Sequence, residues 1–195
     1  MNKILLILIP CLWGGLFVNA QKKPEILNAW FEQSPAMDAK VPAWEWCSQT
    51  ATPDILPGVW NVQTPAYQGN TYLGLICRAD KTYEAIYQKL GLPLQAKACY
   101  KLKVALAVSA AYSGYHRPAR MRIWGGNSPC ERAQLLISSP TIEHTDWKQY
   151  EFFCVPEQNW KYIILECFYK EPCLLPYRGN ILIDALEGFF ACDRA

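Results

Sequence analysis

The segment RMRIWGG (120–126) brings together three side chains that could bind a ligand. Side chains of an extended chain alternate between two faces, so Arg120, Arg122 and Trp124 lie along one face. A sugar ring stacks on an aromatic face, and a guanidinium group binds hydroxyls or carboxylates in a fixed geometry. Polar side chains of neighbouring strands would complete a cleft if they line the same sheet: Glu151, Tyr162 and Glu166. Alternatively, the arginines pair with these glutamates and Trp124 packs in the core.

A second candidate site is the loop AAYSGYHRPAR (110–120), which contains Tyr112, Tyr115, His116 and Arg117. Its glycine and proline favour an exposed loop, in which polar aromatic side chains are available to a ligand. We therefore include Tyr112, Tyr115 and His116 among the candidate ligand-binding residues.

The sequence carries no recognisable catalytic motif. It has two histidines, His116 and His144, and neither a G-x-S-x-G nor an H-E-x-x-H pattern. Two carboxylates could cleave a glycosidic bond at the right separation, which a sequence does not give. We expect a protein that is not an enzyme, and a small glycan hydrolase is the weaker alternative.

Asp184 is an unusual residue for the strand in which it lies. In RGNILIDALEGFF (178–190), it falls between Leu182 and Leu186 on one face, while isoleucines occupy the other. Both faces therefore look buried, and a buried carboxylate needs a cation, several hydrogen-bond donors or a partner chain. Backbone N–H groups and an arginine such as Arg178 are the simplest partners.

Residues 1–20 have the three parts of a secretory signal peptide. Lys3 precedes an apolar run, and Val18, Asn19 and Ala20 form a small-residue cleavage site. We expect cleavage after Ala20 and one exported domain at 21–195, located in the periplasm, at the cell surface or outside the cell. The rest of the chain has no apolar run long enough for a transmembrane segment. The 19 basic and 17 acidic residues form no runs, so nothing indicates a nucleic-acid partner.

Of the nine cysteines, Cys11 lies in the leader, and an even number in an exported chain fits disulfides. Their connectivity cannot be derived from spacing. Three fall within expected strands, where buried thiols are possible: Cys77, Cys154 and Cys167. Three others fall at loops or strand ends: Cys47, Cys130 and Cys192. We expect Cys167 to pair with Cys173 in a short loop, and Cys99 to meet Cys192.

Alternating apolar residues predict about nine strands and no long helix. The expected strands include 71–78, 99–109, 120–126, 133–139, 147–155, 160–169 and 180–190. This pattern is typical of an antiparallel β-sandwich or jelly roll. The segment 81–90 has helical spacing of its apolar residues instead. Arg78 and Glu84 flank the turn 79–81, and a cross-strand ion pair of small energy, if exposed, explains them.

Five motifs together resemble carbohydrate-binding modules with the galactose-binding-like jelly-roll fold. They are EILNAWFEQ (25–33), GNTYLGL (69–75), LPLQAKACYKLKVALA (92–107), WKQYEF (147–152) and ILID (181–184). Three further segments resemble a bacterial cell-envelope version of this domain: PDILPGVW, RIWGG and RGNILID. The resemblance implies that 81–90 is a strand. The family's glycine before the last Tyr of "L-x-x-G-x-x-Y" is replaced here by Ala96 or Lys97.

The resemblance also implies a metal site and a function. In such modules the aspartate of the last strand and the glutamate of the opening motif help to hold a structural calcium, and here these residues are Asp184 and Glu32. The implied function is non-catalytic glycan binding through Trp124 and its polar neighbours, with a glycan as partner. The alternative is a structural or protein-interaction domain whose partner is an envelope protein.

Overall fold

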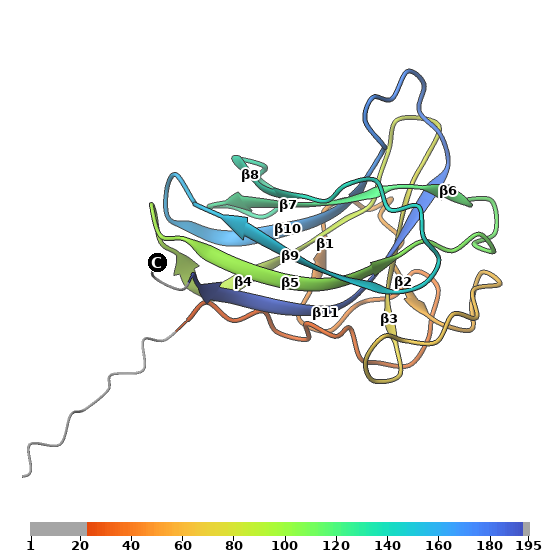
Figure 1. Ribbon diagram of the computed structural model, residues 1–195, viewed down its shortest axis with the longest axis horizontal. Coiled ribbons are helices and arrows are strands. Elements are labelled where there is room, and N and C mark those ends of the chain that lie inside the picture. The colour runs from red at the N-terminus through yellow and green to blue at the C-terminus, as the bar shows by residue number, and fades with distance from the viewer. Residues whose placement is uncertain (1–22, 193–195) are drawn as a thin grey trace, which may run out of the picture.

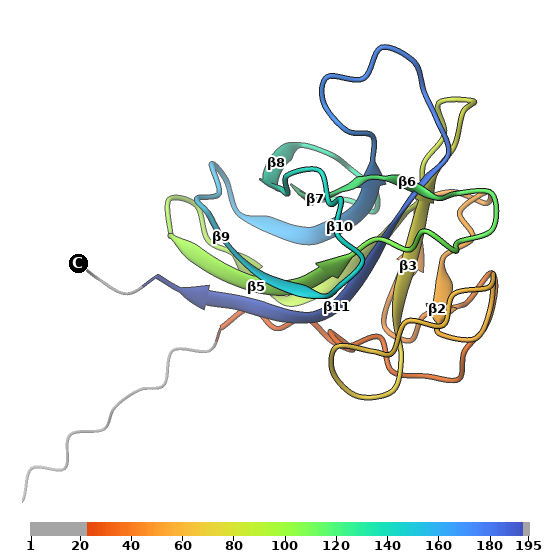
Figure 2. The ribbon, with the colours of Figure 1, turned by 45° about the vertical axis from the view of Figure 1, so that its right-hand side comes forward.

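The structure, a computed structural model, describes residues 23–192, so the expected signal peptide lies outside the described residues. This part of the chain forms eleven β-strands in two antiparallel sheets that pack face to face (Figures 1 and 2). It contains no helix long and apolar enough to cross a membrane. The expected all-β sandwich is confirmed. The expected number of strands was about nine, and two of the eleven are only two residues long.

The two sheets differ in strand order. Sheet A has the order β2 (Asp54–Leu56), β3 (Tyr72–Cys77), β11 (Gly179–Ala191), β5 (Tyr100–Ala107) and β9 (Lys148–Cys154), and β6 (Arg117–Pro118) pairs with β11. Sheet B has the order β1 (Glu45–Trp46), β4 (Ala85–Leu94), β10 (Trp160–Phe168), β7 (Arg120–Gly126) and β8 (Gln134–Ser138). Figure 2 shows β9, β5 and β11 as one curved layer against β7 and β10.

The ambiguous segment 81–90 is a strand from Ala85 onward, as the resemblance implied. Within β4, Ile86 is fully buried between the sheets, whereas Tyr87 lies on the opposite face and is partly exposed. Pairing with β1 on one side and β10 on the other supplies the backbone hydrogen bonds that a helix would have supplied internally. Tertiary pairing therefore decides between the two periodicities that the sequence allows.

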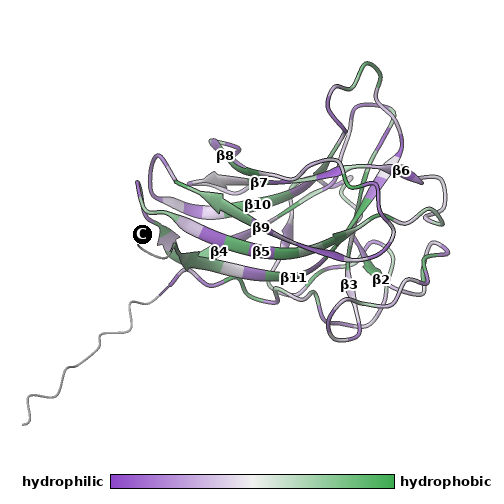
Figure 3. Ribbon diagram, viewed as in Figure 1, coloured by the Kyte–Doolittle hydropathy of each residue, from purple (hydrophilic) through white to green (hydrophobic). Residues whose placement is uncertain are grey.

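The main core fills the space between the sheets. The alternation on β5 buries Leu102, Val104 and Leu106 there, while Lys101 and Lys103 point outward. Figure 3 shows hydrophobic colour concentrated on the strands and hydrophilic colour on many of the connecting segments. A second, smaller core lies on the outer face of sheet A, under segments that include 57–70 and 110–116: Leu56, Val62, Tyr72, Ile76, Ala107, Tyr112 and Leu182. Sheet A is thus covered on both faces around β2, β3 and part of β11, while the outer face of β9 stays exposed.

Two disulfides are present among the described residues. Cys99 pairs with Cys192, as expected, and Cys47 pairs with Cys130. The expected Cys167–Cys173 bond is wrong. Cys167, in β10, faces the main core, whereas Cys173 lies in the following loop with its thiol 3.0 Å from the Leu175 carbonyl oxygen. The three strand cysteines for which buried thiols were considered possible are all free and buried: Cys77, Cys154 and Cys167.

Candidate functional site

Asp184 faces outward from β11 and is closed off by a loop. Its Oδ2 accepts the N–H of Gln68 at 2.9 Å, and its Oδ1 accepts the N–H of Ala185 at 2.6 Å. Ala185 has a φ of 45°, where the strand bulges and turns this N–H toward the carboxylate. Burial raises the pKa of Asp184 to about 6, backbone donors oppose this shift, and the charge of Glu32 adds to it. Backbone donors, one of the expected solutions, therefore satisfy Asp184.

Glu32 holds the other end of the same loop. Its Oε1 accepts the N–H groups of Asn70 at 2.9 Å and of Thr71 at 3.4 Å. Gly69 lies against this carboxylate with a φ of 71°, and a Cβ there would be 1.9 Å from Oε1. Only glycine allows this approach.

The expected calcium ligands, Asp184 and Glu32, therefore both accept hydrogen bonds from one segment, residues 68–71. No group of three or more His, Cys, Asp or Glu side chains that could hold a metal occurs among residues 23–192. Calcium can take most of its ligands from backbone carbonyls, so two carboxylates beside a loop fit its oxygen preference. However, both carboxylates already accept backbone N–H groups. Calcium between them stays a prediction.

Tyr112 belongs to the interior, which corrects its place among the candidate binding residues. Its side chain is 1% exposed and donates a hydrogen bond to Oδ2 of Asp54. Burial and this carboxylate raise the pKa of Tyr112 well above its ordinary value. Tyr115 is partly buried with its ring 5.8 Å from the Arg178 guanidinium, and His116 is exposed. The loop 110–116 thus covers part of sheet A, and Gly114, with a φ of 79°, allows it to turn back.

Glu84, the residue before β4, is a fully buried carboxylate. Its oxygens accept hydrogen bonds from the N–H and hydroxyl of Thr52, the N–H of Ile76 and the guanidinium of Arg78 at 2.6 Å. Burial raises the pKa of Glu84, and these donors oppose the rise. The expected ion pair with Arg78 exists, but Glu84 is fully buried and the pair is not the weak surface contact that was considered.

The outer face of sheet B assembles Trp124, Arg122, Arg120 and Glu166. Glu166 is fully buried and accepts the indole N–H of Trp124 at 2.9 Å, while Arg122 lies 3.7 Å away. Arg122 therefore pairs with Glu166, which was the alternative considered, whereas Arg120 pairs with Glu171, a residue that the sequence did not suggest. Trp124 does not pack in the core between the sheets and remains partly exposed on the outer face. Glu151 does not join them, because it lies on β9 of sheet A, near Lys101 and Lys103.

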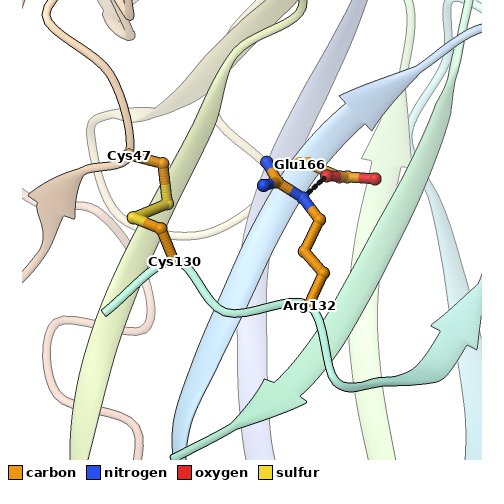
Figure 4. The surroundings of a disulfide bond; sticks show 4 residues. All are labelled: Cys47, Cys130, Arg132 and Glu166. Carbon is orange, nitrogen blue, oxygen red and sulfur yellow. Dashed lines mark hydrogen bonds and ion pairs between the residues drawn. A yellow bond between two sulfur atoms is a disulfide. The ribbon is translucent and has the colours of Figure 1, made fainter. Parts of the chain in front are cut away.

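A strap, residues 127–132, crosses this outer face between β7 and β8. Cys130 in the strap is bonded to Cys47, which follows the edge strand β1 and donates its N–H to the Ala85 carbonyl (Figure 4). Arg132, also in the strap, reaches Glu166 with its Nε at 2.7 Å (Figure 4). A Cβ at Gly126 would lie 2.4 Å from the Glu131 carbonyl oxygen, so glycine lets the strap fold back over the sheet.

A hollow of 340 Å³ lies beside the strap, on the outer face of β4 and β10. Two tyrosine rings, Tyr87 and Tyr162, form part of it with their centroids 6.1 Å apart and their planes at 54°. The other lining residues are Leu27, Ala43, Glu45, Gln88, Lys89 and Pro129. The sequence pattern suggested Tyr162 but missed Tyr87. The alternation of Tyr87 and Lys89 on one face of a strand at 85–94 could have indicated it.

Two other hollows are slightly larger but offer fewer free aromatic surfaces. One of 420 Å³ beside β1 includes a single aromatic side chain, Trp46. The other, of 430 Å³, lies near the start of the described chain and includes Trp30 and Phe190. The Lys23 ammonium group sits 4.0 Å from the centroid of the Phe190 ring and already covers it. The hollow at Tyr87 and Tyr162 is therefore the stronger candidate.

Comparison with known proteins places the fold. No protein-family model matches the sequence, and no curated protein matches it either. An adhesin domain of Lys-gingipain from Porphyromonas gingivalis W83 superimposes with a TM-score of 0.54 at 13% identity, covering 84% of this chain and 96% of that domain. The CBM22-1 xylan-binding domain of Xyn10C from Paenibacillus barcinonensis gives a TM-score of 0.53 at 10% identity, covering 86% and 94%. The chain shares the sandwich fold of carbohydrate-binding modules and adhesin domains.

Proposed function

We propose that this protein is an exported, non-catalytic glycan-binding module whose binding surface is the outer face of sheet B. The observation that carries the proposal is the hollow formed at Tyr87 and Tyr162 beside the disulfide-bonded strap. The fold it shares with a xylan-binding domain and an adhesin domain supports a binding role. Two disulfides support export, because such bonds persist in oxidising compartments.

The chemistry of the hollow suits a sugar. The two rings are partly exposed and tilted, so each can stack on an apolar face of a pyranose, and Glu45 and Lys89 provide groups for hydroxyl hydrogen bonds. Tyr87 is paired with Ile164, which is paired with Trp124. Adjacent strands lie about 4.8 Å apart, so Trp124 stands about 10 Å from Tyr87 across the sheet. Ile164 between them is fully buried, so an oligosaccharide that reaches both rings has to pass over the side chains that cover it.

Binding of the oxidised protein to a glycan array and to insoluble polysaccharides, xylan among them, tests the proposal. Replacing Tyr87 or Tyr162 by Ala should weaken binding roughly tenfold, the loss expected for one stacked ring. Phe153→Ala is the control, because Phe153 is 59% exposed on β9 of the opposite sheet. Binding that survives both tyrosine changes, or that Phe153→Ala weakens equally, would rule out this surface.

A protein-interaction module is the second candidate, and one observation favours it. Leu174 and Leu175 are 96% and 78% exposed at the tip of the loop 169–178, which projects from the sandwich beyond β10 in Figure 1. Exposed leucines in sequence neighbours are typical of contact surfaces. Sedimentation of the wild type and of a Leu174→Ser, Leu175→Ser double variant distinguishes self-association through this loop from glycan binding, which the double variant should retain.

A further inference from the structure

We propose that Arg120 and Arg122 form a binding site for the carboxylate of an acidic sugar, and that Glu171 occupies this site as an internal substitute. The inference rests on the proposed function and specifies its ligand class as glycans that carry a uronic or sialic acid. It concerns the part of the outer face of sheet B that Trp124 shares with these arginines.

Glu171 contacts the two arginines as a ligand carboxylate would. Its Oε2 accepts from Arg120 at 2.6 Å and its Oε1 from Arg122 at 2.8 Å. One carboxylate thus bridges two guanidinium groups, which is the strong, charge-assisted geometry that arginines use to bind carboxylates. The arginine side chains are 14% and 13% exposed, whereas that of Glu171 is 55% exposed. The two guanidinium groups therefore lie mostly buried on the sheet, whereas the Glu171 carboxylate reaches them from the loop after β10.

Arg122 has close contacts that do not depend on Glu171, whereas Arg120 has one weak contact of this kind, its Nη1 lying 3.5 Å from the Ser138 hydroxyl. The Arg122 guanidinium lies 3.2 Å from the centroid of the Phe168 ring and 3.7 Å from Glu166. The Nε–H groups of Arg120 and Arg122 are buried without a hydrogen-bond partner among the described residues. Together with Arg132, three cations face two carboxylates here. Without Glu171, a preformed and positively charged site would remain, with unpaired guanidinium N–H donors.

The loop that carries Glu171 can release it without unpacking a core. Tyr177 fixes the base of the loop, because its hydroxyl accepts the Lys170 N–H and donates to the Pro118 carbonyl oxygen. Beyond this base, Leu174 and Leu175 are almost fully exposed. Glu171 therefore tethers the loop mainly through its exposed ion pairs, and such pairs contribute little to stability.

A sugar carboxylate in this position would place its ring beside an aromatic side chain. Arg122 and Trp124 are two residues apart on the same face of β7, a separation of about 7 Å. That distance fits a pyranose whose carboxylate lies between the arginines and whose ring contacts the indole. Trp124 is kept in orientation by its hydrogen bond to Glu166, which a carboxylate between the arginines would leave intact.

Affinity measurements on acidic and neutral glycan pairs test the inference. The probes are oligogalacturonate with its methyl ester, and sialyllactose with lactose, titrated into the oxidised protein. We expect the acidic member of at least one pair to bind about fivefold more tightly, and Glu171→Gln to raise its affinity by a further two- to fivefold or so, because an internal competitor is removed. Arg120→Gln should abolish the preference, and added salt should reduce it.

The control is Glu157→Gln, which makes the same charge change in the loop between β9 and β10 and should leave all affinities unchanged. Thermal melting of each variant verifies folding. Equal binding of acidic and neutral partners, or no gain from Glu171→Gln, overturns the inference. If neutral glycans still bind and Tyr87→Ala abolishes that binding, the proposed function stands without it. If neither the wild type nor Glu171→Gln binds any glycan, both fail.

Discussion

The two outer faces of the sandwich satisfy their buried carboxylates in different ways. On the side of sheet A, the buried Asp184 accepts two backbone N–H groups, and the buried Glu84 accepts two more together with donors from the Thr52 and Arg78 side chains. On sheet B, Glu166 is equally buried but is held by side chains, those of Trp124 and Arg132 among them. Backbone donors fix the path of the chain, whereas side-chain donors can change partners. The first face is therefore closed for stability, and the second is suited to exchange contacts with a ligand.

The largest expected effect comes from removing each buried glutamate. Glu84→Ala should lower the free energy of unfolding by about 3–5 kcal/mol, because Arg78 and two backbone N–H groups lose their acceptor in the interior. Glu166→Ala should lower it by about 1–3 kcal/mol, because Arg132 can turn to solvent and Arg122 keeps Glu171. Urea unfolding measures both. Equal losses would show that the two faces do not differ in this respect.

A smaller effect is expected at Gly69, in the loop segment that lies against Glu32. Gly69→Ala should lower the free energy of unfolding by about 1–3 kcal/mol, because the added Cβ would displace the Glu32 carboxylate and the φ of 71° disfavours alanine. The matched control is Gly91→Ala in β4 of sheet B, where a Cβ would meet nothing within 4 Å. That change should be neutral or slightly stabilising. Similar losses at both glycines would contradict the idea that this loop is locked.

A third effect is a dependence of the free energy of unfolding on pH, which comes from Asp184. Its pKa of about 6 lies above its ordinary 3.8, so it stabilises the fold fully below pH 3.8, and this contribution is lost as the pH rises through 6. Relative to Asp184→Asn, the wild type should lose on the order of 3 kcal/mol between acidic and neutral pH. Thermal or urea unfolding across this pH range measures the difference. Parallel pH profiles for the two proteins would contradict it.

Calcium gives the same experiment a second arm. If the ion binds between Glu32 and Asp184, it should raise the melting temperature of the wild type at neutral pH, and a chelator should reverse the gain. The gain should be absent in Asp184→Asn. A melting temperature indifferent to calcium and chelator would leave the backbone N–H groups as the partners of both carboxylates.

The strands and the position of Trp124 with its arginines could be predicted because alternation is a local property of the chain. The resemblance was informative as well. Lys97 stands in the region where the resembled family has a glycine, and its φ of 63° is a conformation that glycine adopts readily. The partners of these residues could not be predicted. Cys47 meets Cys130 across 83 positions, and Glu171 reaches back to Arg120 across the sheet. Long-range loop contacts of this kind leave no periodicity in the sequence.

One further expectation failed, and one site residue was missed, for a related reason. The glycine and proline around Tyr112 correctly indicate a loop, but they do not tell whether that loop stands in solvent or folds back onto a sheet. The apolar residues of 81–90 have the spacing of a helix. The sequence pattern therefore did not show that Tyr87 lies on the outer face of a strand. In both cases the side chain's environment depends on a neighbour distant in sequence.

The Cys99–Cys192 disulfide has a mechanical consequence. It joins the end of β11 to the residue that precedes β5, and the Cys192 N–H donates to the Cys99 carbonyl at the same point. Tension applied to the chain after residue 192 would pass through a covalent bond into β5, which lies between β11 and β9 in sheet A. The last strand would then not peel away one hydrogen bond at a time, and the whole sheet would share the pull.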